Sequence, residues 1–372
     1  MGSLGGRIEP SLRGLMPRRG IAGPARRMKS VAFALTLGIA ATWMGCASPA
    51  AKAAEPVSFK GQTVTIVIGY GIGGGYDVYG RLASRFLGKY LPGNPTVIAQ
   101  NMTGAGSLVA ANYLYNIAPK DGTYLGVIGQ TIPVDQLLFE DKAQHFDSAK
   151  FNWIGRMASG VEAIVTWQTA PAKSIDEAKT RQAVIAATGP SSGSAIYPIV
   201  LNHLIGTKFK VVRGYTGTNE MLNAMERGEV DGSGAVNVST LTSEFERWLT
   251  GKNIHVLTQI SLVRHPALPD VPTFVELGQT ERQKTILKLF AASGDVGRAI
   301  LAPPGTPPAR VAAIRMAFMR MTKDPELVTF AKKARIDISP MDGDSLQKLV
   351  EDIRSTPKPI VELAKAAQEQ GN

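Results

Sequence analysis

Short apolar segments alternate with polar ones along most of the chain, and residues Val64–Ile68 show this pattern clearly. Their alternating Val, Ile and Thr side chains are typical of a buried strand. A glycine-rich loop follows, and after it an amphipathic stretch predicts a helix from about Val78 to Tyr90. Asp77 is a suitable N-cap for this helix, because its carboxylate can accept a backbone hydrogen bond.

The same order of strand, small-residue loop and helix recurs along the chain. Further strands are predicted at residues 95–99, 124–128, 151–157, 163–167, 183–187, 209–212, 229–235 and 255–260. Further helices are predicted at residues 108–117, 176–180, 195–205, 219–227, 308–321, 325–334 and 343–368, the last of them broken near Pro357. Asn219 is the expected cap of the helix that ends at Arg227. Strands that alternate with helices predict an α/β fold with open, mostly parallel sheets.

Five of the predicted loops are rich in Gly, Ser, Thr and Asn. They follow a strand and precede a helix at residues 69–77, 101–107, 129–132, 189–194 and 214–218. In an α/β sheet such loops lie beyond the carboxyl ends of the strands, where ligands bind. Amides at helix starts attract anions, and each charge-assisted hydrogen bond contributes roughly 1.5–3 kcal/mol. The loops therefore indicate a site for a small anion, and the alternative is a set of turns that bind nothing.

The first loop also matches a dinucleotide-binding fingerprint, Gly69-x-Gly71-x-x-Gly74. That motif requires an acidic residue about 20 residues further on to bind the ribose. After Asp77, however, the next acidic residue is Asp121, and no Gly-x-x-x-x-Gly-Lys-Ser/Thr motif is present. We therefore expect no nucleotide and no other cofactor.

The first 54 residues have the features of a secretory signal. The basic residues Arg26, Arg27 and Lys29 precede an apolar run from Val31 to Ala41, and small residues follow. The run is too short to span a bilayer, although a retained membrane anchor is an alternative. Cys46 is the only cysteine and follows Gly45, as at a lipoprotein cleavage site. We expect an exported protein, either soluble or tethered by a lipid at Cys46.

Removal of this segment changes the charge of the chain. The whole sequence has a net charge of +11, but residues 1–54 contain eight Lys and Arg residues and one acid, which leaves +4 for the remainder. No block of basic residues interleaved with aromatic ones remains, so nucleic acid is not an expected partner. The remaining 318 residues exceed one ordinary hydrophobic core and indicate two lobes.

A Gly-x-Ser-x-Gly motif at Gly189–Gly193 offers an enzyme as the alternative. It lies between a predicted strand and a helix, as the nucleophile of a serine hydrolase does, with Ser191 in that role. Possible partners follow downstream: Asp231 or Asp270, and His255 or His265. The serines are equally explained as helix caps, and neither histidine is obviously presented to Ser191. We therefore expect no enzyme.

The sequence also lacks His, Cys, Asp and Glu residues at the spacings typical of metal ligands. Asp141, His145 and Asp147 form a loose group, for which a solvated loop is the simpler interpretation. No His-Glu-x-x-His motif and no cysteine pair is present. We expect no metal site.

Six motifs occur in order along the chain, at Gly74–Arg81, Asn101–Gly106, Lys120–Leu125, Gly189–Ser194, Asp270–Glu276 and Pro304–Pro307. Together they resemble the motifs of the receptors of tripartite tricarboxylate transporters, also called the Bug family, over about residues 57–355. Three positions depart from the family pattern. Tyr76 stands where a small hydroxyl residue is common, Gly80 replaces Ala, and Thr216 replaces a Lys near the expected cleft.

The resemblance implies a two-lobed, type II-like periplasmic binding protein whose cleft closes on a small carboxylate. It also implies a small and a large membrane subunit as partners in transport, and we expect a monomer. A variant of this interpretation is a sensor that presents its ligand to a membrane kinase. The expected limits are a signal segment at 1–54, a discontinuous first lobe at 55–165 and 260–372, and a second lobe at 166–259.

The loops and the resemblance together predict the residues that bind the ligand. Most are glycines or carry hydroxyl groups. They are Gly73, Gly74, Gly75, Tyr76, Asp77, Thr103, Gly104, Ala105, Gly106, Ser107, Gln130, Thr131, Ser191, Ser192, Gly193, Ser194, Tyr215, Thr216, Gly217 and Asn237.

Overall fold

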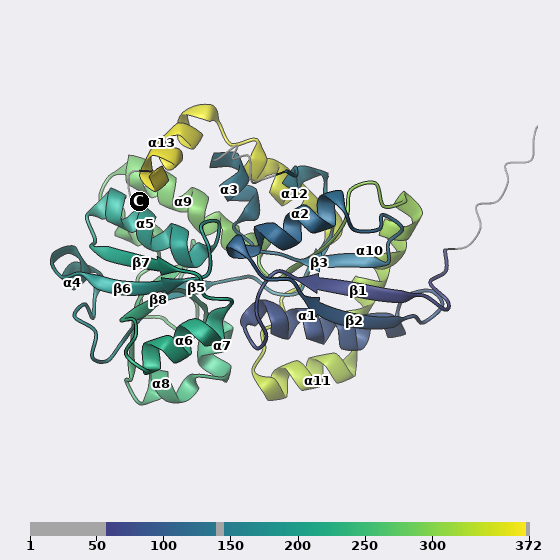
Figure 1. Cartoon of the computed structure of the whole chain (residues 1–372), viewed down its shortest axis with the longest axis horizontal. Coiled ribbons are helices and arrows are strands. Elements are labelled where there is room, and N and C mark those ends of the chain that lie inside the picture. Colours follow the sequence, from purple (N-terminus) through teal and green to yellow (C-terminus); the bar gives the residue numbers. More distant parts are fainter. Residues whose placement is uncertain (1–56, 139–144, 370–372) are drawn as a thin grey trace, which may run out of the picture. The chain divides into compact units, whose positions relative to one another are not determined.

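The computed structural model describes residues 57–138 and 145–369, which carry two β-sheets (Figure 1). In spatial order the first sheet consists of β11 (Met341–Asp342), β4 (Asn152–Arg156), β10 (Ala299–Ala302), β3 (Tyr124–Val127), β1 (Thr63–Ile68) and β2 (Thr96–Asn101). The second consists of β7 (Phe209–Arg213), β6 (Ala183–Ala187), β8 (Gly232–Asn237), β5 (Glu162–Trp167) and β9 (Ile254–Ile260). The expected signal segment with Cys46, and Asp141, lie outside the described residues.

Both sheets combine parallel and antiparallel strands. β1 runs parallel to β2 and β3, and β6 runs parallel to β7 and β8. β4 pairs antiparallel with β10, and β5 pairs antiparallel with β9. The chain passes from one sheet to the other between β4 and β5, and again between β9 and β10. Neither antiparallel pair is therefore joined by the β-α-β crossover that neighbouring parallel strands require. The α/β class is confirmed, and the sheets are mixed rather than mostly parallel.

The helices follow the strands in the predicted order over most of the chain. They are α1 (Gly75–Phe86), α2 (Leu108–Asn116), α3 (Ile132–Leu138), α4 (Ile175–Thr180), α5 (Gly193–Ile205), α6 (Thr218–Glu226), α7 (Val238–Ser243), α8 (Glu246–Thr250), α9 (Glu281–Val296), α10 (Pro308–Met321), α11 (Pro325–Ala334), α12 (Gly343–Arg354) and α13 (Lys358–Glu369). Short 3-10 helices lie at Leu87–Lys89, Ala105–Ser107, Ser148–Lys150 and Val275–Leu277. Among the described residues no helix is both long enough and apolar enough to span a membrane.

The parallel strands place helices on both faces of each sheet. α1 and α2 lie on opposite faces of the first sheet, and α5 and α6 lie on opposite faces of the second (Figure 1). Neighbouring residues of β1 show this, because Ile66 packs with the α1 side and Val67 with the α2 side. Where successive helices leave a sheet on opposite faces, their first turns flank a crevice at the strand ends.

One hydrophobic core extends along the same side of both sheets. Leu114 of α2 belongs to it together with Ile185 of β6, Tyr197 of α5 and Ala364 of α13. Helix α13 contacts α5 as well as α3 and α9, so the end of the chain packs against parts attached to both sheets. We call this cluster the shared core. On the other side, the cluster around α1 and the cluster around α6 are separate.

The two sheets divide the chain close to the expected limits of the lobes. The second sheet begins with β5 at Glu162 and ends with β9 at Ile260. β5 pairs with strands of the second sheet over its whole length, although the expected boundary at 165/166 falls inside it. The limits of the lobes stay a prediction.

Three local expectations are wrong. Gly74, not Asp77, is the N-cap of α1, which begins at Gly75. Gly217, not Asn219, is the N-cap of α6. In both cases the helix starts earlier because glycine and small residues fit the extended backbone of a cap. No helix or strand was predicted within residues 281–302, where the structure contains α9 and β10.

Candidate functional site

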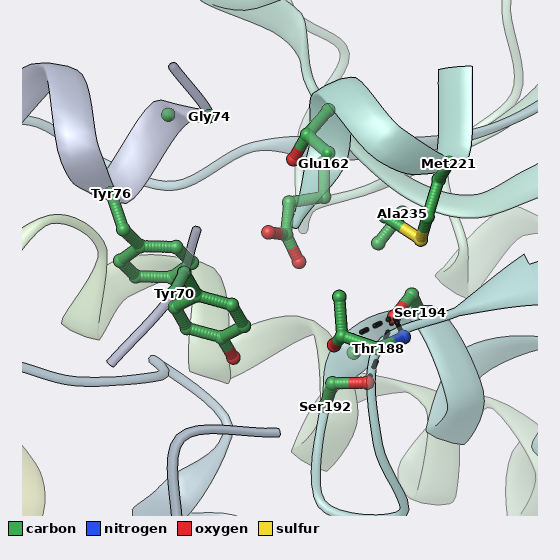
Figure 2. A pocket seen from close by; sticks show the side chains of 12 residues that line it. Tyr70, Gly74, Tyr76, Glu162, Thr188, Ser192, Ser194, Met221 and Ala235 are labelled. Carbon is green, nitrogen blue, oxygen red and sulfur yellow. Dashed lines mark hydrogen bonds between the residues drawn. The ribbon is translucent and has the colours of Figure 1, made fainter. Parts of the chain in front are cut away.

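A small cavity lies where the loops after β1 and β6 meet the first turns of three helices (Figure 2). Its volume is about 30 Å³, which gives room for water but not for a ligand, since ligand pockets measure roughly 300–1,000 Å³. The cavity is lined by Tyr70, Gly74, Gly75, Tyr76, Glu162, Thr188, Ser192, Gly193, Ser194, Thr218, Met221 and Ala235. We call it the first cavity.

A second cavity of about 140 Å³ shares two of its lining residues with the first. Tyr70 and Thr188 line both cavities, so their side chains form the partition between them. The remaining lining of the second cavity is Gly69, Thr103, Gly104, Ala105, Gly106, Ser107, Gly214, Tyr215 and Thr216.

Three helices begin at the first cavity without a capping side chain. The N-caps are Gly74 for α1, Ser192 for α5 and Gly217 for α6, and none makes a side-chain hydrogen bond to its first turn. Side chains do cap α4, α9, α11 and α12, which begin elsewhere. The first amides of an uncapped helix have no acceptor within that helix and carry its positive dipole end. The amides at these three helix starts can therefore attract an anion to this place between the loops.

Hydroxyl groups line the same side of the first cavity as the start of α5 (Figure 2). The Ser192 hydroxyl donates to the carbonyl of Gly189 at 2.7 Å and lies 2.8 Å from the Ser194 hydroxyl. The amide of Thr188 donates to the Ser194 oxygen at 3.1 Å. This network fixes the hydroxyls beside the open amides of α5, where a carboxylate can accept from both.

Aromatic side chains form the opposite wall. The rings of Tyr70 and Tyr76 stack with centroids 4.4 Å apart and planes 13° from parallel. The Arg298 guanidinium lies 4.1 Å from the centroid of the Tyr76 ring. Burial raises the pKa of Tyr76 to about 12, although Arg298 lowers it in part. Both tyrosines are therefore neutral at physiological pH and present ring surfaces to the cavity.

One buried ion pair lies beside these rings. Nη2 of Arg298 donates to Oε1 of Glu162 at 3.3 Å, and Nη1 donates to Gln130 at 2.9 Å. Gln130 in turn donates to the carbonyl of Gly160 at 2.8 Å. Burial raises the pKa of the Glu162 carboxyl, and the Arg298 guanidinium offsets part of that rise. The pair connects the start of β5 in the second sheet to the segment that enters β10 in the first.

Thirteen of the residues predicted to bind the ligand line one of the two cavities. Six line the first cavity: Gly74, Gly75, Tyr76, Ser192, Gly193 and Ser194. Seven line the second: Thr103, Gly104, Ala105, Gly106, Ser107, Tyr215 and Thr216. Residues from loops far apart in the sequence are thus brought together, and their contact with a ligand stays a prediction.

The other seven residues predicted to bind the ligand line neither cavity. The side chains of several of them make hydrogen bonds that stabilise the loops. Asp77 accepts hydrogen bonds from Gly73, Arg81 and Asn101. The Thr131 hydroxyl donates to the Ser191 carbonyl, and Asn237 accepts from the amide of Ser239 as the cap of α7. The seven are Gly73, Asp77, Gln130, Thr131, Ser191, Gly217 and Asn237.

The cavities also contain residues outside the predicted set: Gly69, Tyr70, Glu162, Thr188, Gly214, Thr218, Met221 and Ala235. Four of these, Gly69, Tyr70, Gly214 and Thr218, lie within loops that the sequence pattern had marked. For Glu162 the available signal was a lone acidic residue at the start of the apolar strand Glu162–Trp167. In the sequence Met221 and Ala235 cannot be distinguished from ordinary core residues. Their place beside the cavity is visible only in the folded structure.

The arrangement around Ser191 differs from a hydrolase nucleophile. Ser191 is buried, and it is absent from the described residues with positive φ, whereas a nucleophile elbow is a strained turn. The imidazole of His255 faces Lys173 and Glu177, and burial lowers its pKa. Nδ1 of His265 accepts from Ala267, and its Nε2 lies 3.8 Å from Asp337. In the described part of the chain no cluster of metal-ligating residues is present either.

Comparisons with known proteins give a family and a fold. A family model described as "Tripartite tricarboxylate transporter family receptor" matches residues 87–365. The solved periplasmic binding protein BugD is 21% identical, with a TM-score of 0.66 over 82% of this chain and 97% of BugD. MatC from Rhodopseudomonas palustris, solved with bound malate, is 22% identical, with a TM-score of 0.64 over 80% of this chain and 98% of MatC.

A third solved structure is R. palustris Rpa4515 with adipate. It is 18% identical, with a TM-score of 0.64 over 81% of this chain and 97% of Rpa4515. At such identities the likeness to these three proteins concerns the fold.

Proposed function

The chain belongs to the receptors of the tripartite tricarboxylate transporter family, and from this premise we propose that it is a periplasmic receptor for a small carboxylate. The family predicted from the six motifs is thereby confirmed. In this proposal the protein binds its ligand between the two sheets and is a binding protein, not an enzyme. It delivers the ligand to a small and a large membrane subunit.

One observation carries the proposal: the uncapped starts of α1, α5 and α6 surround a single cavity. Amide groups from three helices, together with the hydroxyls of Thr188 and Ser194, offer a carboxylate several charge-assisted hydrogen bonds. The relatives solved with malate and with adipate support the same class of ligand. The small volume of both cavities means that the loops must separate for a ligand to enter.

A thermal-shift panel of mono-, di- and tricarboxylates tests the ligand class. A ligand at 100 times its Kd stabilises the folded state by about 2.7 kcal/mol, which raises the melting temperature. We expect a rise with at least one carboxylate. A flat response to all carboxylates, combined with a rise for sugars or cations, would overturn the proposal.

A matched pair of variants tests the place of binding. Thr188 lines both cavities. Thr188→Val removes its hydroxyl without changing the shape of the side chain, and we expect at least a tenfold loss of carboxylate affinity. Thr180→Val makes the same change at an exposed position, where the hydroxyl bonds only to the Glu177 carbonyl of its own helix. Equal affinities of the two variants by calorimetry would place the ligand elsewhere.

Delivery to a transporter needs a test in cells. We expect deletion of the gene to abolish uptake of the carboxylate, and the wild type but not Thr188→Val to restore it. Genes for a small and a large membrane subunit beside this one would agree with transport. Binding without any change in uptake would instead point to the sensor interpretation.

A further inference from the structure

In the described part of the chain, strand β2 pairs with β1 alone and forms one edge of the first sheet (Figure 1). The Met102 amide, just after β2, donates to the Ile68 carbonyl of β1. Because amide directions alternate along a strand, the amides of Val97, Ala99 and Asn101 point away from β1. Among the described residues none accepts a hydrogen bond from these three amides. The outer side of β2, which we call the β2 edge, can therefore pair with a further strand.

The segment that contains β2 and α2 carries no charge. No Asp, Glu, Lys, Arg or His occurs between Lys89 and Lys120, although 19% of the whole chain is Asp, Glu, Lys or Arg. Charged side chains on an edge strand normally discourage another strand from pairing with it. The β2 edge lacks this protection.

Exposed apolar side chains of β2 and α2 lie on one face of the first sheet. Ile98 is opposite Thr65 in the register of β2 with β1, so it projects on the same face as Val67, which packs with α2. Ile98 is 45% exposed, and Val109 of α2 is 46% exposed. A Cβ on Gly104, shortly after β2, would lie 2.7 Å from the Val109 side chain, so α2 begins beside the end of β2. Apolar surface thus accompanies the open strand edge.

The other edges of the two sheets are protected. β7 carries the exposed residues Lys210 and Arg213 and directly follows exposed Lys208. β9 is covered by a following segment, in which the Phe274 amide donates to the Gln259 carbonyl. β11 has only two residues. Charge, a covering segment and short length are common protections of a sheet edge, and within the described residues β2 has none of the three.

We propose that the β2 edge is a dimer interface, at which the β2 strands of two copies of this chain pair antiparallel about a two-fold axis. With the axis at Ala99, the outward amides and carbonyls of Val97 meet those of Asn101, and Ala99 meets its own copy. Ile98 then packs against Gln100 of the other copy. Such a dimer places each part of a surface opposite the same surface, which an uncharged strand permits. The dimer replaces the monomer that the family resemblance implied.

Sedimentation equilibrium of the purified protein tests whether the chain associates. A single added strand pairing makes an interface of modest area, so concentrations of about 1–100 µM are suitable. We expect the mass of one chain at the lower end of this range and of two chains at the upper end. The mass of one chain throughout would overturn the proposal and would leave the β2 edge for a segment of another protein.

A matched pair of variants tests whether the β2 edge is the surface that associates. Ile98→Lys adds a charge of the kind that protects β7, and we expect it to weaken association at least tenfold. Val328→Lys makes a similar change on α11, where Val328 is 46% exposed, and should associate as the wild type does. Wild-type association of a folded Ile98→Lys protein, or an equal loss in both variants, would overturn the proposal.

Hydrogen exchange on the wild type locates the interface without a substitution. We expect the amides of Val97 and Ala99 to exchange at least tenfold more slowly at about 100 µM than at about 1 µM, because they gain acceptors in the dimer. The Ile98 amide points to β1 in both states and should change little. Protection that appears with concentration on other strands but not at Val97 and Ala99 would overturn the proposal. This measurement decides the matter even if Ile98→Lys does not fold.

Discussion

At the scale of single residues, the carboxylate of Asp77 organises the loop between β1 and α1. It lies inside the first turn of α1, where it accepts hydrogen bonds from the Gly73 amide, from Arg81 and from Asn101 at 2.8–2.9 Å. Its side chain is 3% exposed, while that of Arg81 is 46% exposed. Asp77 thus holds the glycines of the loop around the first cavity without lining that cavity.

Replacement of Asp77 should therefore reduce stability more than loss of its ion pair does. For Asp77→Ala we expect a loss of about 2–3 kcal/mol in the free energy of unfolding, because buried donors lose their acceptor. For Arg81→Met we expect less than about 1 kcal/mol, because the Arg side chain is half exposed. Urea denaturation measures both, and equal losses would contradict the assigned role.

The same carboxylate gives stability a dependence on pH. Burial raises the pKa of Asp77, but hydrogen bonds from Arg81, Gly73 and Asn101 outweigh burial and lower it overall. Because the folded-state pKa lies below the unfolded value of about 3.9, this contribution is present above that pH and is lost as the pH falls through the folded-state pKa. We expect Asp77→Asn to flatten the decline in unfolding free energy below pH 4, and an unchanged slope would contradict this.

The types of residue in the site could be predicted from the sequence more easily than the role of each residue. The glycine and hydroxyl loops were found because small residues between strand and helix are visible in the sequence. Asp77 was assigned as a cap because a lone Asp before a helix usually is one. Glu162 was missed because nothing in the order of residues shows which way the first side chain of a strand points. That direction depends on the register of β5 with β8 and β9.

At the scale of elements, two loops from different sheets come into backbone contact. A Cβ on Gly106 would lie 2.7 Å from the amide nitrogen of Ser192, and Gly189 packs against the backbone of Ala105 and Gly106. Glycine is required at 106 for this close approach as well as for its φ of +68°. The approach brings the second cavity against the start of α5.

A pair of Gly→Ala variants separates loop contact from backbone strain. Gly106→Ala must push the two loops apart, so we expect it to weaken binding of the best carboxylate of the panel at least tenfold. Gly206 has a similar φ of +75° but nothing within 4 Å of the added Cβ. Gly206→Ala should lose only about 1–2 kcal/mol of stability and keep its affinity. Equal affinities by calorimetry would show that the loops need not touch.

Helix α9 shows why one element escaped sequence-based prediction. Its last turn contains Ser293 and Gly294, which are weak helix formers. Tertiary contacts hold that turn, because the Ser293 hydroxyl lies 3.0 Å from the Tyr197 hydroxyl and the Gly294 carbonyl accepts from the amide of Gly160. Contacts of this kind are not visible in the sequence.

The first turn of α9 carries a local signal that can be tested. Thr280 accepts from the Gln283 amide, and the Gln283 side chain accepts from the Thr280 amide, which together form a capping box. We expect Thr280→Ala to lower the free energy of unfolding by about 1 kcal/mol in urea denaturation. Thr285→Ala, later in the same helix and half-buried, is the control, because its hydroxyl bonds only to the Glu281 carbonyl of the same helix. An equal loss there would exclude a capping effect.

At the scale of the whole described molecule, polar contacts join the two sheets on the side of α1 and α6. The Gly71 amide donates to the Thr216 carbonyl at 2.9 Å, and the Ser239 hydroxyl donates to Asp337 at 2.6 Å. The Asp337 carbonyl also accepts from the Tyr79 hydroxyl. A few hydrogen bonds are easily exchanged for water, whereas opening the shared core would expose many apolar side chains. Opening is therefore expected on this side.

Hydrogen exchange tests this asymmetry. Ser239→Ala removes one of the contacts, and we expect the Gly71 amide to exchange at least threefold faster while amides of α5 are unaffected. Ser243→Ala is the control, because its hydroxyl bonds only to the Ser239 carbonyl within α7. Faster exchange in α5 would show that the shared core opens instead.

The order of strands and helices that build the two sheets was largely predictable from the sequence, because strands and helices alternate and loops rich in Gly, Ser, Thr and Asn separate them. The antiparallel pairings were not, since they depend on which strands carry the chain between the sheets. Nor did the pattern reveal that Ala364 and Ala367 of the final helix belong to a core shared with α5. Alanines on a helix give little indication of what covers them.

The position of α13 in the shared core has a consequence for how the first cavity forms. Ala364 and Ala367 complete the apolar support beneath α5, whose first turn lines that cavity. The wall of the first cavity therefore depends on residues more than 160 positions further along the chain than the loop that precedes α5. A chain that lacks α13 is expected to leave the underside of α5 exposed to water, and with it to lose the rigid placement of the α5 first turn.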